Sequence, residues 1–298
     1  MKTLREYIKQ AEEKGVAIGH FNISNLEGLR GIYNAAKKIS ALGGSAFGGK
    51  LPVIIGLSEG EEKFVGRAEG VALINAIRNR DNYPIFLNAD HHSSFESVKN
   101  AIDAGFDMVI IDGAKLSFED NVKITKECVD YARSVNKDTG RDVLVEAELG
   151  YIGSGSDIKD TIPEGAGILT TPKDALKFVQ DTGIDLFAPS VGSIHGLIKS
   201  GKPHINADLV TEIKKVTGIP LVLHGGSGLR DEDFTNAIQA GISVVHINSE
   251  IRLADRDAVK KAIEENPNEI VPAKILQPAV DAIEKIVYER LKLFNGVK

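Results

Sequence analysis

Three of the seven histidines in this chain follow short apolar segments that have the character of β-strands. They are His91, His195 and His224, and each lies at or just past the C-terminal end of its segment. Neutral imidazoles are common zinc ligands, and a catalytic zinc site uses three protein ligands and leaves one position open. A single histidine is more often a packed or surface residue. The shared position of these three favours a metal site.

Carboxylates accompany these histidines at the ends of the same kind of segment. Asp90 directly precedes His91, and neighbouring residues at a strand end can face different sides, so one can bind metal while the other acts as an acid or base. The alternative for Asp90 is a helix N-cap. Asp112 and Glu148 can bind metal or accept a hydrogen bond from a ligating histidine, and for Asp112 a cap or ion pair is an equal alternative. His92 is expected to be exposed.

A glycine-rich turn begins at His224. The sequence His224-Gly-Gly-Ser-Gly228 lets backbone N–H groups approach an anion closely, and such turns commonly hold phosphate. Asn248 and Ser249 follow the next predicted strand. In eight-stranded α/β barrels the loops after strands seven and eight often form the phosphate site. The two segments together predict a phosphate-binding site beside the histidines.

Eight short apolar segments, each followed by a segment of helical period, indicate alternating strands and helices. Their continuous apolar character is typical of parallel strands covered on both faces. Thr3 with Glu6 forms a capping-box pattern, and Pro172 suits a first helical position. The sequence predicts an α/β fold, one (β/α)8 TIM barrel domain over residues 1–298 with a C-terminal helical extension. The predicted strands are Val16–Phe21, Val53–Leu57, Ile85–Ala89, Met108–Ile111, Val143–Glu148, Leu186–Pro189, Leu221–His224 and Val244–Asn248.

Three segments stand apart from this repeat. Gly43–Gly49 and Gly150–Thr171 are predicted to be mobile loops, and the second follows the fifth strand, where long loops act as lids or carry chemistry. The stretch Pro272–Phe294 places apolar residues three and four apart, which predicts one apolar helical face. That face can pack on the barrel or contact another subunit, and the sequence leaves both open.

Composition restricts the partners. A net charge of -6 and a pI near 5.7 give no general attraction for nucleic acid or an anionic membrane. The start of the chain has no apolar signal core, and no stretch approaches the roughly 18 apolar residues of a membrane span. The one cysteine, Cys128, cannot form an intramolecular disulfide and lies in a predicted helix, Asn121–Asn136. We therefore expect a cytoplasmic protein that acts on small molecules.

These residues resemble the class II, zinc-dependent fructose-bisphosphate and tagatose-bisphosphate aldolase family over nearly the whole chain. The resemblance rests on seven ordered motifs, too many to arise readily by chance. They are Gly19–Glu27 (GHFNISNLE), Pro52–Gly60 (PVIIGLSEG), Ala89–His91 (ADH), Ile111–Gly113 (IDG), Val145–Gly150 (VEAELG), Gly192–Gly196 (GSIHG) and Leu221–Gly228 (LVLHGGSG).

The resemblance implies Zn2+ on His91, His195 and His224, with Co2+ or Mn2+ able to use similar ligands. Glu148 and Asp112 match acidic positions that the family uses around the metal. A monovalent cation, Na+ or K+, is expected nearby.

The resemblance also implies roles in substrate binding and proton transfer. Asp90 is expected to move the proton of the hydroxyl whose oxygen becomes the aldehyde. Nine further residues are expected to line the rim and to contact the substrate, including the phosphate of its dihydroxyacetone phosphate half. These are Asn22, Ser58, Gly196, Gly225, Gly226, Ser227, His246, Asn248 and Ser249.

Three departures from the family pattern mark this chain as divergent. After the fifth strand the family has Gly-Gly-x-Glu-Asp with a proton-transferring glutamate, whereas this chain has Gly153–Asp157 (GSGSD) with Ser156 at the glutamate position. Either another acid assists or none does, and Asp157, with Glu164 further along, is the expected candidate. His246 stands where the family has asparagine, and the stretch Ser40–Lys50 is longer than usual.

The expected reaction is reversible cleavage of fructose 1,6-bisphosphate to dihydroxyacetone phosphate and glyceraldehyde 3-phosphate. Three alternatives stay open: tagatose bisphosphate or another ketose phosphate as substrate, a lysine Schiff-base aldolase, and a non-catalytic sugar-phosphate-binding subunit. A Schiff-base enzyme is disfavoured because no lysine lies at the end of a predicted strand. A homo-oligomer, dimer or tetramer, is expected.

Overall fold

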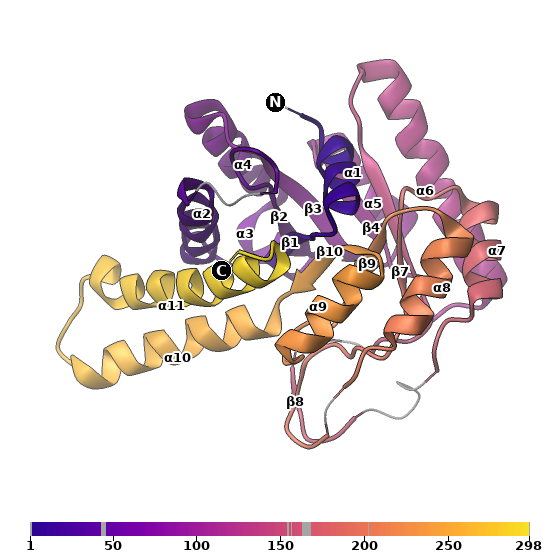
Figure 1. Ribbon diagram of the computed structural model, residues 1–298. Helices are drawn as coiled ribbons and strands as arrows, with labels where there is room; N and C mark the ends of the chain where they lie inside the picture. The colour runs from indigo at the N-terminus through magenta and orange to yellow at the C-terminus, as the bar shows by residue number, and fades with distance from the viewer. Residues whose placement is uncertain are drawn as a thin grey trace.

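Eight parallel strands form a closed barrel in the order β1-β10-β9-β7-β5-β4-β3-β2 (Figure 1). The computed structural model describes residues 2–42, 46–153, 155, 157–162, 168–201 and 203–297. Each barrel strand overlaps one predicted strand, which confirms the (β/α)8 prediction. The strands are β1 (Ile18–Asn22), β2 (Val53–Ser58), β3 (Ile85–His92), β4 (Met108–Ile111), β5 (Leu144–Leu149), β7 (Leu186–Pro189), β9 (Leu221–Leu223) and β10 (Ile242–Ile247).

Helices surround the barrel and cover its outer face (Figure 1). The Thr3–Glu6 capping box is present at the start of α1, and Pro172 occupies the first turn of α7, as predicted. The helices are α1 (Leu4–Lys14), α2 (Leu26–Ala41), α3 (Glu59–Val65), α4 (Arg67–Asp81), α5 (Phe95–Ala104), α6 (Phe118–Thr139), α7 (Pro172–Thr182), α8 (Ala207–Thr217), α9 (Asp231–Ala240), α10 (Ser249–Glu265) and α11 (Pro272–Phe294). None of the described helices is long and apolar enough to cross a membrane.

A second, two-stranded sheet connects the loops beyond β5 and β7. β6 (Ile158–Lys159) pairs in parallel with β8 (Leu197–Ile198). The sequence showed no strand pattern here because each strand has two residues. Ile152 and Thr170 in the first loop are buried. The segment from 150 to 171, expected to be mobile, is therefore anchored at both ends, while residues 154, 156 and 163–167 lie outside the described residues.

The last two helices form an antiparallel hairpin that projects from the barrel (Figure 1). Helix α11 packs on α2, α10 and β1, and in its C-terminal half Val280, Ile283, Val287, Leu291 and Phe294 are buried. This half of the predicted apolar face therefore packs on its own chain. Between Arg252 and Pro278 no side chain of the hairpin is buried.

Packing of α2 against α11 depends on Gly31. A Cβ atom at this position would lie 2.7 Å from Cγ2 of Ile283 and 2.9 Å from the carbonyl oxygen of Val280. At Gly60 in α3, by comparison, a Cβ atom would have no neighbour within 4 Å. Gly60 therefore offers a matched glycine without this restriction.

We expect Gly31→Ala to lower the free energy of unfolding by about 1 to 3 kcal/mol, because the added methyl group overpacks the interface. Gly60→Ala should be neutral or stabilise the protein by up to about 1 kcal/mol, because alanine is the better helix former. Thermal and denaturant unfolding of both variants measures the difference. Equal stability of the two variants would show that α11 can move away from α2 at no cost.

Candidate metal centre and phosphate cradle at the barrel rim

Four side chains, two from the ends of β3 and β5 and two from the segments that follow β7 and β9, bring one ligand atom each to a common point at the rim. They are His91, Glu148, His195 and His224, whose ligand atoms all lie within 4.8 Å of one another. Nδ1 of His224 lies 3.1 Å from Nε2 of His91 and 3.5 Å from Oε2 of Glu148. Nε2 of His195 lies 3.8 Å from the same carboxylate oxygen. A tetrahedral zinc site with bonds of about 2.1 Å has ligand atoms about 3.4 Å apart.

The donor set therefore fits a divalent metal ion. Oε2 of Glu148 and Nε2 of His195 are buried and have no hydrogen-bond partner in the described part of the chain. Buried polar atoms without partners are costly, and a cation would satisfy both. Three imidazoles and one carboxylate suit zinc in particular. The three histidines that the sequence singled out, with Glu148, are thus brought together.

Electrostatics around the histidines also suit metal binding. Burial holds the pKa of His224 well below its usual value, which favours the neutral imidazole that binds metal. For His91 burial favours the neutral ring too, but the carboxylates of Asp90, Asp112 and Glu148 raise its pKa to about 10. A metal ion must therefore displace a proton from His91 when it binds.

His91 owes its direction to an irregularity at the end of β3. The pairing of β3 with β4 shifts register between Ala89 and His92, and His91 adopts a positive φ of 52°. Such a conformation in a non-glycine residue costs about 1 to 3 kcal/mol and clusters at functional sites. Nδ1 of His91 lies 2.9 Å from Oδ2 of Asp112, which leaves Nε2 to face the centre. Asp112 thus lies within hydrogen-bond distance of a candidate metal ligand, which is one of the roles that the sequence left open for it.

Glu146 holds His224 from the opposite side, a residue that the sequence pattern did not single out. Oε1 of Glu146 lies 2.6 Å from Nε2 of His224, and neither side chain has any solvent exposure. When Nδ1 of His224 binds metal, its Nε2–H can donate to this carboxylate and fix the ring. Burial raises the pKa of Glu146 well above its usual value, and a metal cation nearby would oppose that shift. The alternation of β5, with Glu146 and Glu148 both facing inward, was the available signal.

Asp90 lies beside the metal centre and has one carboxylate oxygen available. Its Oδ2 accepts a hydrogen bond of 2.8 Å from Nδ2 of Asn22. Its Oδ1 lies 3.5 Å from Nδ1 of His246 and has no hydrogen-bond partner among the described residues. Burial disfavours the charged form, but His91, His246 and His20 outweigh it and hold the pKa of Asp90 well below its usual range. Asp90 thus keeps an ionised carboxylate beside the candidate metal centre.

The structure decides two expectations about the end of β3, one for Asp90 and one for His92. The N-cap of α5 is Ser94, whose hydroxyl accepts from the backbone N–H of Ser97, so the cap interpretation of Asp90 is excluded. His92 was expected to be exposed, and this was wrong. Its ring is fully buried, with Nε2 3.2 Å from Oε1 of Glu62 in α3. The helix α3, absent from the sequence-based prediction, covers this position.

His246 lies on the floor of the site between two other imidazoles. Its ring stacks on His20 with centroids 3.5 Å apart and an angle of 3°, and on His224 at 4.2 Å. Burial lowers the pKa of both His246 and His20. Nδ1 of His246 lies 3.5 Å from Oδ1 of Asp90, so the stack borders this carboxylate. His20 was missed because its position inside the barrel is set by pairing between β1 and β10, which brings His20 opposite His246.

Glycines and the start of α10 form a cavity next to the metal centre. Gly225 has a φ of +62°, and a Cβ there would lie 2.6 Å from the backbone of Ile194, so a side chain is excluded. The N-terminus of α10, which begins at Ser249, borders the same cavity, and helix N-termini attract anions. The structure thus assembles the predicted phosphate positions. The cavity is lined by Asn22, Asp90, His91, His195, Gly196, Gly225, Gly226, Ser227, His246, Asn248 and Ser249.

A second cavity continues from Asp90 and His91 toward the outside of the rim. Ser58, Lys115, Tyr151 and Arg252 are among its lining residues. Ser58 has a second role, since it forms a capping box with Glu61 at the start of α3.

The loop acid expected after β5 is not brought to the metal centre. Asp157 is exposed and lines a neighbouring surface cavity with Ser249 and Arg252. Ser156 and Glu164 lie outside the described residues. The role expected for Asp157 therefore stays a prediction.

We expect Glu146→Gln to lower zinc affinity by about 10- to 100-fold, as is typical when the carboxylate behind a ligating histidine is lost. The substitution keeps the shape of the side chain but removes the charge that holds His224. Competition with a chromophoric chelator measures the dissociation constant, and circular dichroism checks the fold. An unchanged zinc affinity would mean that Glu146 has no part in orienting His224.

Known proteins match this chain along its whole length. The family model described as fructose-bisphosphate aldolase class-II matches residues 2–298. The fructose-bisphosphate aldolase of Geobacillus stearothermophilus is 38% identical over 297 residues, which cover 99% of this chain and 96% of that protein. The probable fructose-bisphosphate aldolase of Bacillus subtilis is also 38% identical, with 99% and 97% covered.

Solved structures agree with this assignment. The crystal structure of the YdjI aldolase from Escherichia coli K12 has a TM-score of 0.79 and 29% identity, covering 98% of this chain and 96% of that one. A putative fructose-1,6-biphosphate aldolase from Coccidioides immitis has a TM-score of 0.79 and 25% identity, covering 98% and 95%. With the same motifs gathered at the rim of a closed barrel, this chain belongs to the class II fructose-bisphosphate aldolase family.

Proposed function

We propose that this chain reversibly cleaves fructose 1,6-bisphosphate to dihydroxyacetone phosphate and glyceraldehyde 3-phosphate. The observation that carries the proposal is the position of Asp90, whose available oxygen lies between a four-ligand metal centre and a glycine-lined cavity. Family membership sets aside the Schiff-base alternative. Tagatose 1,6-bisphosphate, which differs at one stereocentre, is the alternative substrate.

The cavity beside α10 suits the phosphate of the dihydroxyacetone half. Backbone N–H groups of the turn Gly225–Ser227, together with the start of α10, offer donors and a favourable dipole. Gly196 and Asn248 line the same space. A monovalent cation, Na+ or K+, would further neutralise phosphate charge here. At the other end of the substrate, Lys115 and Arg252 line the second cavity and can attract the second phosphate.

Zn2+ is the metal that we propose for His91, His195, His224 and Glu148, with Co2+ or Mn2+ as substitutes. Bound there, it would supply Lewis acidity that polarises a carbonyl and stabilises developing negative charge. Asp112 and Glu146 hold two of the histidines in position for it.

The proton steps fall to carboxylates of this chain. In cleavage, Asp90 Oδ1 takes the proton of the C4 hydroxyl as the C3–C4 bond breaks, and returns it in condensation. The low pKa of Asp90 keeps it ionised and ready to accept. Asp157 is our candidate for protonation at C3, in place of the glutamate that the family carries at the position of Ser156. Because Asp157 lies outside the metal cavity, this role requires the loop to move over the substrate.

The proposal is tested by measuring metal content and cleavage of fructose and tagatose 1,6-bisphosphates before and after chelation. Activity should vanish on chelation and return with zinc. Asp90→Ala should keep its zinc but lose roughly 100-fold or more in kcat, because a general base is removed while the ligands stay. Wild-type protein that binds zinc and cleaves neither compound would favour the non-catalytic, sugar-phosphate-binding alternative.

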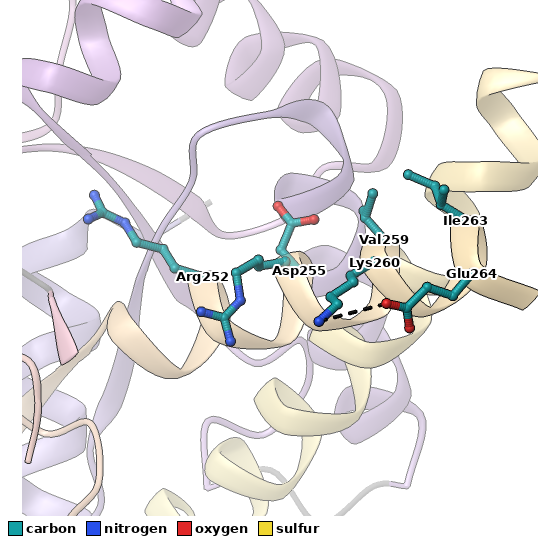
Figure 2. Close-up of a pocket in the computed structure, with 7 residues that line it drawn as sticks. Arg252, Asp255, Val259, Lys260, Ile263 and Glu264 are labelled. Atoms are coloured by element: carbon teal, nitrogen blue, oxygen red, sulfur yellow. Dashed lines mark ion pairs between the residues drawn. The ribbon is translucent and has the colours of Figure 1, made fainter. Parts of the chain in front are cut away.

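We propose further that the chain forms a homo-oligomer, a dimer or tetramer, through the α10–α11 hairpin. Helices in proteins owe most of their stability to packing, yet no side chain from Arg252 to Pro278 is buried. Figure 2 shows Val259 and Ile263 of α10 among charged side chains of both signs. Charges of both signs allow two copies in antiparallel contact to form ion pairs, for example between Arg252 of one copy and Glu264 of the other. A second copy of this chain is therefore the occupant that we propose.

Val259→Asp combined with Ile263→Asp should lower the oligomer mass measured by light scattering, because both charges would be buried at the contact. Val216→Asp on α8 is the control, since Val216, like Ile263, is an exposed apolar residue on a helix, and its mass should match the wild type. A wild-type monomer, or an unchanged mass in the double variant, would contradict this assembly.

The buried thiol of Cys128 agrees with the cytoplasmic location that we propose from the sequence.

A further inference from the structure

A buried glutamate in α3 lies between the rim and the surface. Glu61 is 4% exposed. Its Oε2 accepts hydrogen bonds from Nδ2 of Asn22 at 2.8 Å and from the backbone N–H of Ser58 at 2.9 Å. Its Oε1 accepts from Nη2 of Arg252 at 2.6 Å. One carboxylate thus joins β1, the start of α3 and the first turn of α10.

The amide of Asn22 links this carboxylate to Asp90. Its Nδ2 donates to Oε2 of Glu61 and to Oδ2 of Asp90, both at 2.8 Å. A side-chain amide nitrogen has two hydrogens, so both are used. A flipped amide would place its oxygen against two carboxylates, which are acceptors only when ionised. Glu61 therefore determines which way the Asn22 amide faces.

Fixing Asn22 determines which oxygen of Asp90 is available. With Oδ2 held by Asn22, Oδ1 has no hydrogen-bond partner among the described residues. Rotation of the Asp90 carboxylate would break the bond to Asn22. Glu61 and Asp90 lie close together because both accept from the Asn22 amide, and the guanidinium of Arg252 provides the opposite charge that a buried carboxylate needs.

We propose that Glu61 is a positioning residue that acts through Asn22 to hold Asp90 in its proton-accepting orientation, with Arg252 neutralising the buried charge. This inference rests on the proposed function for the role of Asp90 as the base. The hydrogen bonds that join Glu61, Asn22 and Asp90 do not depend on that function, and the two can be tested separately.

Four variants and one control test the proposal. Glu61→Ala removes both acceptor oxygens, and Glu61→Gln keeps one. Glu62→Gln is the matched control, because Glu62 is the adjacent buried glutamate of α3 and pairs with Arg67 and His92 instead. Asn22→Ala, alone and combined with Glu61→Ala, reports whether Glu61 acts through Asn22.

The structural measurement needs no activity. In crystal structures of zinc-loaded Glu61→Ala, the Asn22 amide should be turned or should no longer donate to Asp90. The Glu62→Gln structure should keep the hydrogen bond from Asn22 to Asp90. If this hydrogen bond also persists in Glu61→Ala, the proposal is overturned, whatever the enzyme turns over.

The kinetic measurement uses the ketose bisphosphate that the wild-type enzyme cleaves. Glu61→Ala should lower kcat by roughly 10- to 100-fold, the scale expected when a reacting group is misplaced by about 1 Å, with KM and zinc content little changed. Glu61→Gln should lose less, and Glu62→Gln should match the wild type. On the Asn22→Ala background, Glu61→Ala should cause no further loss. Additive losses, or a Glu61→Ala enzyme with wild-type kcat, would overturn the proposal. A wild-type protein without cleavage would instead refute the proposed function, and the crystal structures would still decide the role of Glu61.

Discussion

The arrangement of the whole rim depends on convergence of three imidazoles and a carboxylate at one point inside a low-dielectric barrel end. Each of these groups loses its water there, and such groups persist only when fixed partners replace the water. Asp112 supports His91, and Glu146 supports His224. Carboxylates placed behind histidines keep a set ring orientation and raise the basicity of the ligands. Asp112 and Glu146 are therefore as much a part of the candidate metal centre as the four ligands, because they hold two of the histidines in position.

Asp90 has support of its own. Nδ1 of His246, whose ring stacks on His20, lies 3.5 Å from one carboxylate oxygen, and Asn22 donates a hydrogen bond to the other. Rigid support of this kind matters because proton transfer requires heavy atoms within hydrogen-bond distance at the moment of reaction. His246 stands where the family resemblance predicted an asparagine, and its ring is the larger group.

The α10–α11 hairpin is less buried than the barrel. The barrel buries its own apolar surface, whereas the α10–α11 hairpin leaves most of its side chains partly or fully exposed. Helix α10 begins at the glycine-lined cavity and carries Arg252, which donates a hydrogen bond to Glu61. Its position therefore affects both this cavity and the hydrogen bonds that lead to Asp90. Packing on the exposed face of α10 would therefore also restrain residues at the rim. Helix α10 therefore links the exposed surface of the hairpin to residues at the rim.

The sequence by itself determined the alternation of strands and helices, the identity of the three histidines and the glycine turn. These features depend on local periodicity and on the rule that parallel strands end at one rim. Only the tertiary structure decided which groups stand behind the ligands. Glu146, His20 and Glu61 make their contacts at the rim with residues distant in the sequence, and these contacts depend on barrel register and on where α3 packs. The burial of His92 and the distance of Asp157 from the metal centre have the same origin, because side-chain direction at a strand end and the path of a long loop are set by packing between distant segments rather than by neighbours in the chain.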